Sequence, residues 1–254
     1  MSKNLNYFIS KYEDSISKLV QVGAHFGQEL EIFDQYNVDK VYLFEPLPEA
    51  HVELEKKIKN NPKYELFKFG LGSKSEIKKL FYSNENKGQS SSFLKPKLHK
   101  KIQPQIGFRD NLTIKIEKFN NLNIDSVDFL VLDVQGFELE VLKGFSHKLK
   151  NVKFVFAEVN RDQLYEDNVL VRDLDKYLKN YEFIRIWTSW RPADMPWGDA
   201  FYIKKDYLNI FQSTMKKISN LLFTNKLFFL IYRIIDFRVH KKNIKKILFS
   251  RQWK

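Results

Sequence analysis

Short apolar runs alternate with stretches of helical periodicity through most of the chain. Between the runs, apolar residues recur three or four positions apart, as with Ala50, Leu54 and Ile58, which is the spacing of one helix face. Each run is short enough for a buried strand and stops at or near a glycine or an acidic residue. The runs that predict strands in this way are residues 18–23, 40–45, 64–69, 127–132 and 152–159.

This alternation of strands and helices predicts an α/β fold with a mostly parallel sheet and helices on both faces. A helix is expected before the first strand, and a pair of strands over residues 183–187 and 200–203 is expected to close the domain. Another helix is expected to begin at Gly27, with its unpaired N–H groups pointing back at the turn after the first strand. Further strands are expected over 76–82 and 113–119. The predicted division is an N-terminal helix over 1–17, a domain over 18–205 and a basic helical tail over 206–254.

The segment 83–110 departs from this pattern because it has little periodicity of either kind. It contains three consecutive serines, Ser90 to Ser92, together with Pro96 and Pro104. A loop of this length inside a compact domain is either a lid over a site or a disordered insert. The sequence leaves both alternatives open.

Chemically distinctive residues gather where the predicted strands end. In a parallel α/β sheet, ligands bind beyond the carboxyl ends of the strands. Gly23 lets a ligand approach the backbone, and the acidic Glu45 follows about twenty residues later, a spacing suited to holding the two hydroxyls of a nucleoside ribose. The alternative is a tight strand-to-helix connection with no ligand. Residues at such strand ends are Gly23, Glu45, Leu71, Asp133 and Glu158.

Composition excludes several kinds of chemistry. The 254-residue chain has no cysteine, so disulfides, thiolate metal sites and cysteine nucleophiles are ruled out. Hydrophobic residues make up 43% of the chain, which is enough for a packed core. The N-terminal residues lack the apolar core of a signal peptide, and the run 227–235 is far shorter than a membrane span. We therefore expect a cytoplasmic protein, either free or peripheral on the inner membrane face.

The positive charge is concentrated in the tail. Residues 206–254 hold 11 of the 43 basic residues but only 2 of the 31 acidic ones, and so carry a net +9 of the total +12. A basic segment rich in aromatic and aliphatic residues suits an anionic membrane surface. A helical hairpin packed on the body or on a second copy is an equal alternative. Nucleic acid is a third interpretation, weaker because the body itself is nearly neutral.

Several motifs together resemble one enzyme family. They are the stretch from Val22 to Gln28, Phe44-Glu45-Pro46, Leu71-Gly72, Ser90 to Ser92, Asp133-Val134-Gln135-Gly136-Phe137-Glu138 with Val141-Leu142-Lys143-Gly144, and Gly198-Asp199-Ala200. In this order they resemble the FkbM-type S-adenosylmethionine-dependent methyltransferases over residues 18–204. The resemblance implies a class I (Rossmann-like) methyltransferase fold and O-methylation of sugars or natural products. The cofactor-binding residues implied are Gln21, Gly23, Ala24, His25, Gly27, Gln28, Glu45, Pro46, Leu71, Ser91 and Asp133.

The chain departs from the family pattern at three positions. Gln21 stands where Asp is usual, His25 where Asn is usual, and Gln135 where Glu is usual. The first two belong to the predicted cofactor loop. The third puts in doubt any mechanism that needs a carboxylate at residue 135.

Methyl transfer to an alcohol needs a base, because a neutral hydroxyl is a weak nucleophile. Candidates are Asp133, Glu138, Glu158 and His25, of which Asp133 and then Glu158 are the predicted catalytic residues; His25 is better explained as a loop residue that donates to the backbone. Asp133 has an alternative role as a helix cap. Oxygen ligands at Asp133, Glu158 and Asn160 would suit magnesium, but nothing in their spacing requires a metal.

Three tryptophans, Trp187, Trp190 and Trp197, lie close together in the sequence. They suit either a sugar-binding face or a hydrophobic plug over the edge of the sheet. The sequence thus predicts a methyltransferase acting on a hydroxyl of a sugar or surface glycan. Two other hypotheses remain: a methyltransferase of RNA or protein, and a non-catalytic family member that binds a membrane or partner.

Overall fold

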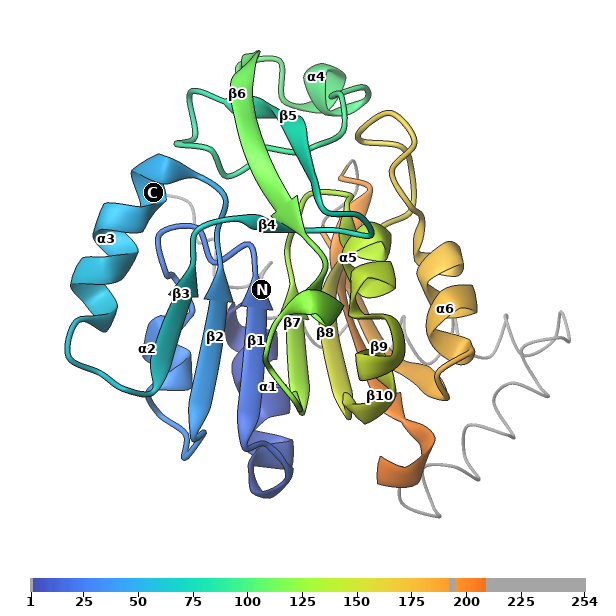
Figure 1. The fold of residues 1–254 in the computed structure, drawn as a ribbon. Coiled ribbons are helices and arrows are strands. Elements are labelled where there is room, and N and C mark those ends of the chain that lie inside the picture. The colour runs from blue at the N-terminus through green and yellow to red at the C-terminus, as the bar shows by residue number, and fades with distance from the viewer. Residues whose placement is uncertain (1, 192–194, 209–254) are drawn as a thin grey trace, which may run out of the picture. The chain divides into compact units, whose positions relative to one another are not determined.

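The computed structural model describes residues 2–191 and 195–208 (Figure 1). Residues Met1–Lys205 form one compact unit, and the fold below is that unit. The basic tail predicted from residue 206 lies outside the described residues from Asn209 onward. The boundaries predicted at residues 17/18 and 205/206 therefore stay predictions.

A seven-stranded sheet runs through the middle of the unit (Figure 1). Its strand order is β3-β2-β1-β7-β8-β10-β9, and the first five of these strands are parallel to their neighbours. β10 is antiparallel to both β8 and β9. The mostly parallel sheet predicted from the sequence is confirmed. Its strands are β1 (Lys18–Val22), β2 (Lys40–Phe44), β3 (Tyr64–Phe67), β7 (Phe129–Leu132), β8 (Phe154–Asn160), β9 (Phe183–Trp190) and β10 (Trp197–Lys204).

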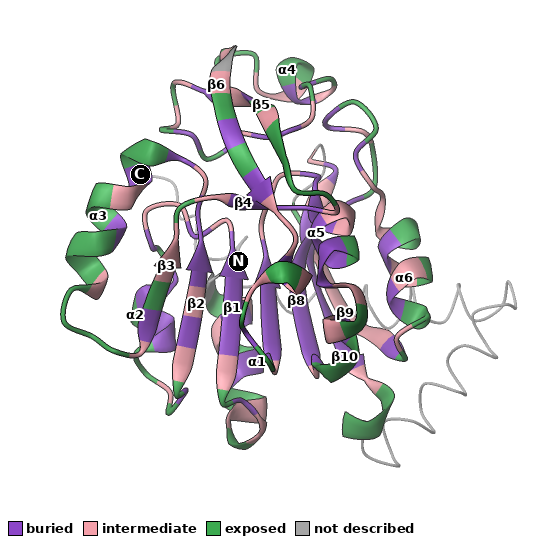
Figure 2. Cartoon of the chain, viewed as in Figure 1, coloured by how far each residue is buried: buried purple, intermediate pink, exposed green. Residues whose placement is uncertain are grey.

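Helices cover both faces of this sheet. In Figure 1, α1 and α2 lie behind it and α5 lies in front. The strands are buried along most of their length, whereas the helices are exposed on their outer sides (Figure 2). This is the pattern expected from strands that are apolar throughout and helices that are apolar on one face. The helices are α1 (Ser2–Tyr12), α2 (Leu30–Phe33), α3 (Pro48–Ile58), α4 (His99–Ile102), α5 (Glu138–Phe145) and α6 (Val171–Lys179), with 3₁₀ turns at Glu13–Ser15, Phe119–Asn121, Ser146–Asn151 and Lys205–Tyr207.

Aromatic rings fix the first helix to the sheet. The Phe8 ring stacks on the Phe201 ring with 4.0 Å between centroids and meets the Trp187 ring edge-on at 5.2 Å. Phe8 and Phe201 are both buried. The helical pattern of the first residues therefore reflects a face that belongs to the core of the main sheet.

The helix expected to begin at Gly27 is shorter than the pattern suggests. Gly27 has φ of +72°, in the left-handed region, so a right-handed helix cannot include it. The chain instead turns through residues 25–29, and α2 covers only Leu30–Phe33. The helix N-terminus that we expected to point toward the glycine turn is therefore absent at that position.

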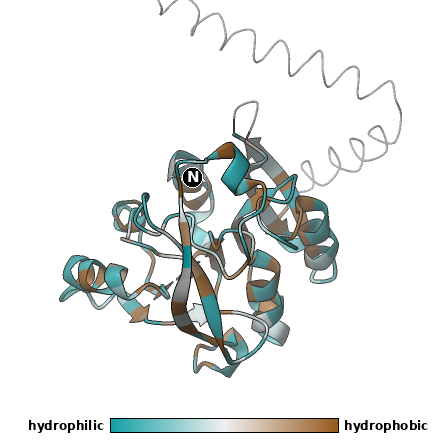
Figure 3. Cartoon of the chain, turned by 90° about the horizontal axis from the view of Figure 1, so that it is seen from above, coloured by the Kyte–Doolittle hydropathy of each residue, from teal (hydrophilic) through white to brown (hydrophobic). Residues whose placement is uncertain are grey.

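A second, three-stranded sheet crosses above the carboxyl ends of the main strands (Figure 1; seen from above in Figure 3). It consists of β4 (Gly70–Leu71), β6 (Phe108–Glu117) and β5 (Glu76–Ser83), in that order. The segment 83–110 is folded between β5 and β6: Phe81 and Ser92 form a β-bridge, and so do Pro96 and Tyr165. The alternative of a disordered insert is therefore wrong, because Ser92 and Pro96 in the middle of the segment are paired to β5 and to Tyr165.

The close packing of α5 against the second sheet depends on Gly144. A Cβ atom built on Gly144 would lie 2.1 Å from the carbonyl oxygen of Gly72, which is a backbone atom that cannot rotate away. We expect Gly144→Ala to lower the free energy of unfolding by about 1–3 kcal/mol, even though alanine favours helix by ~1 kcal/mol. Urea denaturation would measure the change.

Gly107→Ala provides a matched control for this prediction. The Cβ at position 107 would have the flexible Glu85 carboxylate as its nearest neighbour, at 3.3 Å. This variant should unfold within ~0.5 kcal/mol of the wild type. Equal stability of the two alanine variants would contradict the proposed contact.

Candidate functional site

A cavity of about 360 Å³ opens at the carboxyl ends of β1, β2 and β7. This volume lies in the usual range for small-molecule sites. Its wall includes Gly23, Glu45 and Asp133, each of which directly follows one of these strands. Because Val22 is in register with both Phe44 and Leu132, the three residues lie side by side. Of the residues predicted from the sequence, those that line the cavity are Gly23, His25, Gln28, Glu45, Pro46, Ser91 and Asp133.

The other predicted residues lie outside the cavity wall. Ala24 and Leu71 are buried, Ala24 in the turn after β1 and Leu71 in the second sheet. Gly27 packs toward the Leu30 side chain. The remaining two, Gln21 and Glu158, are hydrogen-bonded to residues that do line the cavity, Glu29 and Gln135 respectively. The structure therefore gives these five no direct surface on the cavity, and any role in binding stays a prediction.

Gly23 is required by the geometry of the strand ends. Its φ of +84° lies in the left-handed region, and a Cβ there would be 2.0 Å from the carbonyl oxygen of Asp133. The Gly23 N–H donates to the Phe44 carbonyl at 2.9 Å. The ends of β1, β2 and β7 can approach one another only because residue 23 has no side chain.

The carboxylate of Glu45 is fixed by two backbone N–H groups. The His25 N–H donates to Oε2 at 2.6 Å, and the Leu47 N–H donates to Oε1 at 2.8 Å. The side chain is only 2% exposed, and burial raises its pKa to about 7. Each oxygen keeps a lone pair for a further donor, since a carboxylate oxygen accepts two hydrogen bonds. Glu45 is thus a rigid acceptor pair in the cavity wall.

The ring of His25 joins the glycine turn to the segment above it. Its Nε2 lies 2.7 Å from the Lys87 carbonyl oxygen, and its Nδ1 lies 2.8 Å from the Gln28 amide nitrogen. Because a carbonyl only accepts, Nε2 must carry the proton and Nδ1 must accept from Gln28. His25 therefore donates to the backbone, which matches the interpretation preferred from the sequence over a catalytic role.

The segment 88–93 and the end of β5 form the opposite wall of the cavity, which the sequence analysis largely missed. Besides the predicted Ser91, this wall includes Leu80, Gly88, Gln89 and Phe93. The hydroxyl of Tyr165 donates to the carbonyl of Ser90 at 2.9 Å. The only sequence signal was a polar segment containing a glycine, which is typical of any loop.

Gln135 connects the two predicted catalytic carboxylates. Its Nε2 donates to Asp133 Oδ1 at 2.8 Å and to Glu158 Oε2 at 3.2 Å, while its Oε1 accepts from Tyr165 at 3.1 Å. Burial raises the pKa of Asp133 to about 6, and the negative charges of Glu29 and Asp199 add to this effect. Burial also raises the pKa of Glu158 well above its usual value, and repulsion by Asp133 adds to it. A glutamate at residue 135 would lose these donors, so glutamine suits its surroundings here.

Glu138, another candidate base, has a structural role. Its Oε1 accepts from the backbone N–H groups of Val134 and Gly136, at 3.2 Å and 3.1 Å. The residue is fully buried and lies outside the cavity wall. Burial raises the pKa of Glu138 to about 7. Its carboxyl group holds the turn between β7 and α5.

Among the described residues there is no metal cluster, and the three tryptophans singled out in the sequence lie away from the cavity. In the described part of the chain, no three His, Asp or Glu side chains are arranged to hold a metal ion. Trp187 is half-buried and packs edge-on against Phe8 of α1, and the Arg161 guanidinium lies 5.5 Å from the Trp190 ring centre. None of the three tryptophans lines the cavity.

Over residues 2–191 and 195–208, no helix has the length and hydropathy needed to cross a membrane.

Comparison with known proteins identifies the family. A model of the methyltransferase FkbM domain matches residues 21–185, which is more than half of the chain. The 2-O-methyltransferase NoeI of Sinorhizobium fredii is 21% identical over 186 residues, covering 69% of this chain and 76% of that protein.

A solved structure supports the same fold. The FkbM methyltransferase of Methylobacillus flagellatus superposes with a TM-score of 0.51 at 14% identity, over 74% of this chain and 44% of that one. The present chain thus spans less than half the length of that relative. The predicted resemblance and α/β fold class are confirmed. The chain belongs to the FkbM methyltransferase family, and residues 21–185 form its S-adenosylmethionine-dependent methyltransferase domain.

Proposed function

We propose that the protein binds S-adenosylmethionine in the cavity above β1, β2 and β7 and methylates a hydroxyl of a sugar or surface glycan. The observation that carries this proposal is the Glu45 carboxylate, held in the cavity wall by two backbone N–H groups. A ribose presents two adjacent hydroxyls, which match the two free acceptor positions of this carboxylate. The NoeI relative, a 2-O-methyltransferase, supports a sugar acceptor.

The surroundings of Glu45 fit the rest of a nucleoside. Pro46 and Leu47 offer apolar surface in the same wall, which suits a planar base. At Gly23 a Cβ would fill the turn, so its absence leaves the backbone open to close approach. The cofactor residues that we propose on this basis are Gly23, His25, Gln28, Glu45 and Pro46.

When bound, S-adenosylmethionine supplies a methyl group on a positively charged sulfur. Asp133 lines the same cavity, and we assign it as the base that accepts the proton of the acceptor hydroxyl. Gln135 donates to Asp133 Oδ1 and so holds that carboxylate in place. The wall formed by Leu80 and Phe93 keeps water from this part of the cavity.

Glu45→Gln should weaken binding of S-adenosylmethionine by ~100-fold, because glutamine loses the charge and one acceptor oxygen. Isothermal titration calorimetry would measure the dissociation constant. Glu53→Gln is the matched control, since Glu53 lies on the exposed face of α3 in an ion pair with Lys57. Binding to the Glu45 variant within threefold of the wild type would contradict the assignment of the ribose site.

The acceptor can be identified by methyl transfer from labelled S-adenosylmethionine. We expect incorporation into a panel of oligosaccharides, with no incorporation into RNA or protein. The basic tail 206–254 gives the alternative a specific test, since transfer to a polyanion would fall steeply with salt. Salt-sensitive methylation of RNA would favour that alternative. Binding without transfer to any acceptor would favour a non-catalytic family member. Recruitment of the enzyme to an anionic membrane by the tail stays a prediction.

A further inference from the structure

A buried amide–carboxylate pair, Gln21 and Glu29, lies beside the glycine turn. The proposed function assigns no role to this pair. Gln21 is the residue before the last in β1 and is 1% exposed, and Glu29 lies in the turn before α2 and is 9% exposed. The Gln21 Nε2 donates to Glu29 Oε2 at 2.9 Å. Glu29 lines the cavity, whereas Gln21 stands behind it. The pair therefore presents a carboxylate to the cavity from a fixed position.

This pair has acceptor capacity that the described residues do not use. Gln21 Oε1 is buried and has no hydrogen-bond partner among them. Glu29 uses Oε2 to accept from Gln21, and a carboxylate has further lone pairs to offer. An unsatisfied buried acceptor is unfavourable, so a donor is expected to reach the pair when the cavity is filled. Burial raises the pKa of Glu29, and a bound cation would favour its ionised form.

The charge of the cavity favours a cationic ligand group. Three carboxylates, Glu29, Glu45 and Asp133, line it, and no lysine or arginine from the described residues does. Glu45 is already bound by two backbone N–H groups and suits a ribose. Asp133 is held by Gln135. Glu29 is the remaining carboxylate, and it lies on the side of the Gly23 turn.

We propose that Glu29, positioned by Gln21, binds the α-ammonium group in the amino-acid part of S-adenosylmethionine. This assignment rests on the proposed cofactor site. An ammonium group has three N–H donors, which match the free lone pairs of the Glu29 carboxylate in the cavity wall. The amide of Gln21 holds that carboxylate in place through a hydrogen bond across the turn.

The test compares three ligands that share a nucleoside. S-adenosylmethionine and S-adenosylhomocysteine both carry the amino-acid part, whereas 5′-methylthioadenosine lacks it. In Glu29→Gln, calorimetry should show ~10- to 100-fold weaker binding of the first two, because a charge-assisted hydrogen bond is lost. Binding of 5′-methylthioadenosine should stay within threefold. S-adenosylhomocysteine keeps the ammonium group but has no charged sulfur. A similar loss for both ligands would therefore assign the effect to the ammonium group and not to the charge on sulfur.

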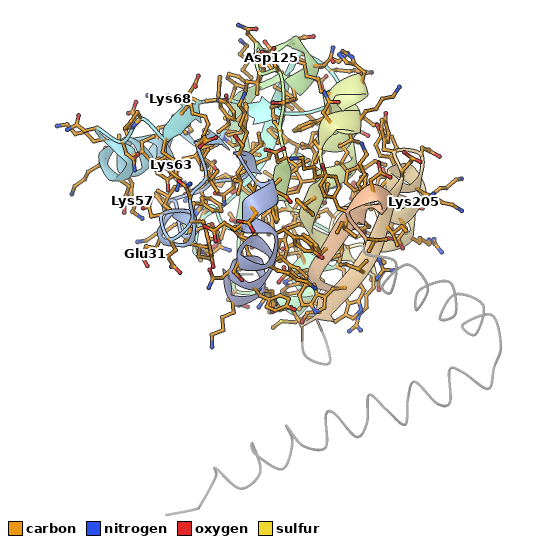
Figure 4. All side chains as sticks on the ribbon, turned by 90° about the horizontal axis from the view of Figure 1, so that it is seen from below. Glu31, Lys57, Lys63, Lys68, Asp125 and Lys205 are labelled. Carbon is orange, nitrogen blue, oxygen red and sulfur yellow. The ribbon has the colours of Figure 1, made fainter. Side chains whose placement is uncertain are left out.

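Two further variants complete the design. Glu31→Gln changes an exposed carboxylate on α2 that points away from the sheet (Figure 4), and it should bind all three ligands as the wild type does. The exchange Gln21→Glu with Glu29→Gln keeps one amide and one carboxylate in the pair. The exchange keeps the hydrogen bond but moves the carboxylate to residue 21, behind the cavity wall. Binding of S-adenosylmethionine should therefore stay ~10- to 100-fold weaker than in the wild type, whereas a merely structural role for Glu29 would predict its recovery.

The outcomes distinguish a failure of the role proposed for Glu29 from a failure of the proposed cofactor site. Unchanged binding of S-adenosylmethionine in Glu29→Gln would overturn the role of Glu29, as would an equal loss of 5′-methylthioadenosine. If Glu29→Gln does not fold, the exchange variant replaces it, and binding of S-adenosylmethionine by that variant within threefold of the wild type would also overturn the role. Failure of the wild type to bind any of the three ligands would instead refute the proposed cofactor site.

Discussion

Asp133→Asn should lower kcat for methyl transfer by about 10²- to 10⁴-fold, which is the usual contribution of a general base. Asparagine keeps an oxygen that can accept from Gln135, so the geometry of this corner should persist. Binding of S-adenosylmethionine should stay within about threefold of the wild type. Initial rates at saturating donor and acceptor would measure kcat, and calorimetry would measure binding.

The pH dependence of the wild-type enzyme gives this prediction a second readout. Burial raises the pKa of Asp133 to about 6, and a base acts only when ionised. Below about pH 6, kcat should therefore fall tenfold for each unit of pH, and above it kcat should level off. The residual activity of Asp133→Asn should lack this acid limb.

Asp125→Asn is the matched control, because Asp125 is exposed and precedes the amino end of β7, whereas Asp133 follows its carboxyl end. It should leave both kcat and the acid limb unchanged. Persistence of the acid limb in Asp133→Asn would assign the base elsewhere, with Glu158 as the first alternative, since it shares the Gln135 amide.

Gly23→Ala should remove measurable binding of S-adenosylmethionine, a loss of at least ~100-fold. The added Cβ would lie 2.0 Å from the Asp133 carbonyl oxygen, so the end of β1 or β7 must move. Alanine also disfavours the φ of +84° by about 1–2 kcal/mol. Together with overpacking, we expect the free energy of unfolding to fall by about 3 kcal/mol.

Calorimetry and urea denaturation would measure the two effects of this substitution. Gly107→Ala serves again as the control, because its Cβ meets side-chain atoms of Glu85 and Asn84 and no backbone atom. Circular dichroism would show whether Gly23→Ala is folded at the temperature of the titration. A folded variant that binds within tenfold of the wild type would show that the strand ends tolerate a side chain and that the cofactor lies elsewhere.

The strand ends could be predicted from the sequence because their signals are local. Each of these strands is an apolar run that stops at a glycine or an acidic residue. Parallel pairing then brings the strand ends together. This reasoning correctly placed Gly23, Glu45 and Asp133 in one wall. It failed at Gly27, where the left-handed φ prevents the helix from starting and the apolar periodicity gave no warning.

The opposite wall could not be predicted, because its contacts join residues that are far apart in the chain. His25 meets the Lys87 carbonyl across 62 residues, and Tyr165 meets the Ser90 carbonyl across 75. Both acceptors are backbone carbonyls, so no side-chain pattern marks them. The hydrogen bonds that join Asp133 and Glu158 through Gln135 were missed for a different reason. In the sequence, Gln135 indicated only that a carboxylate was missing at that position, whereas its amide donates to both Asp133 and Glu158.

The two walls of the cavity come from separate parts of the chain. Gly23, Glu45 and Asp133 follow strands of the main sheet, whereas Leu80 and Phe93 belong to the second sheet and the segment that follows it. Side chains in residues 73–117 can therefore change without disturbing the nucleoside half, as long as the backbone carbonyl of Lys87 still accepts from His25. In evolutionary terms, a lineage could change its acceptor through substitutions in residues 73–117 while it keeps the same methyl donor.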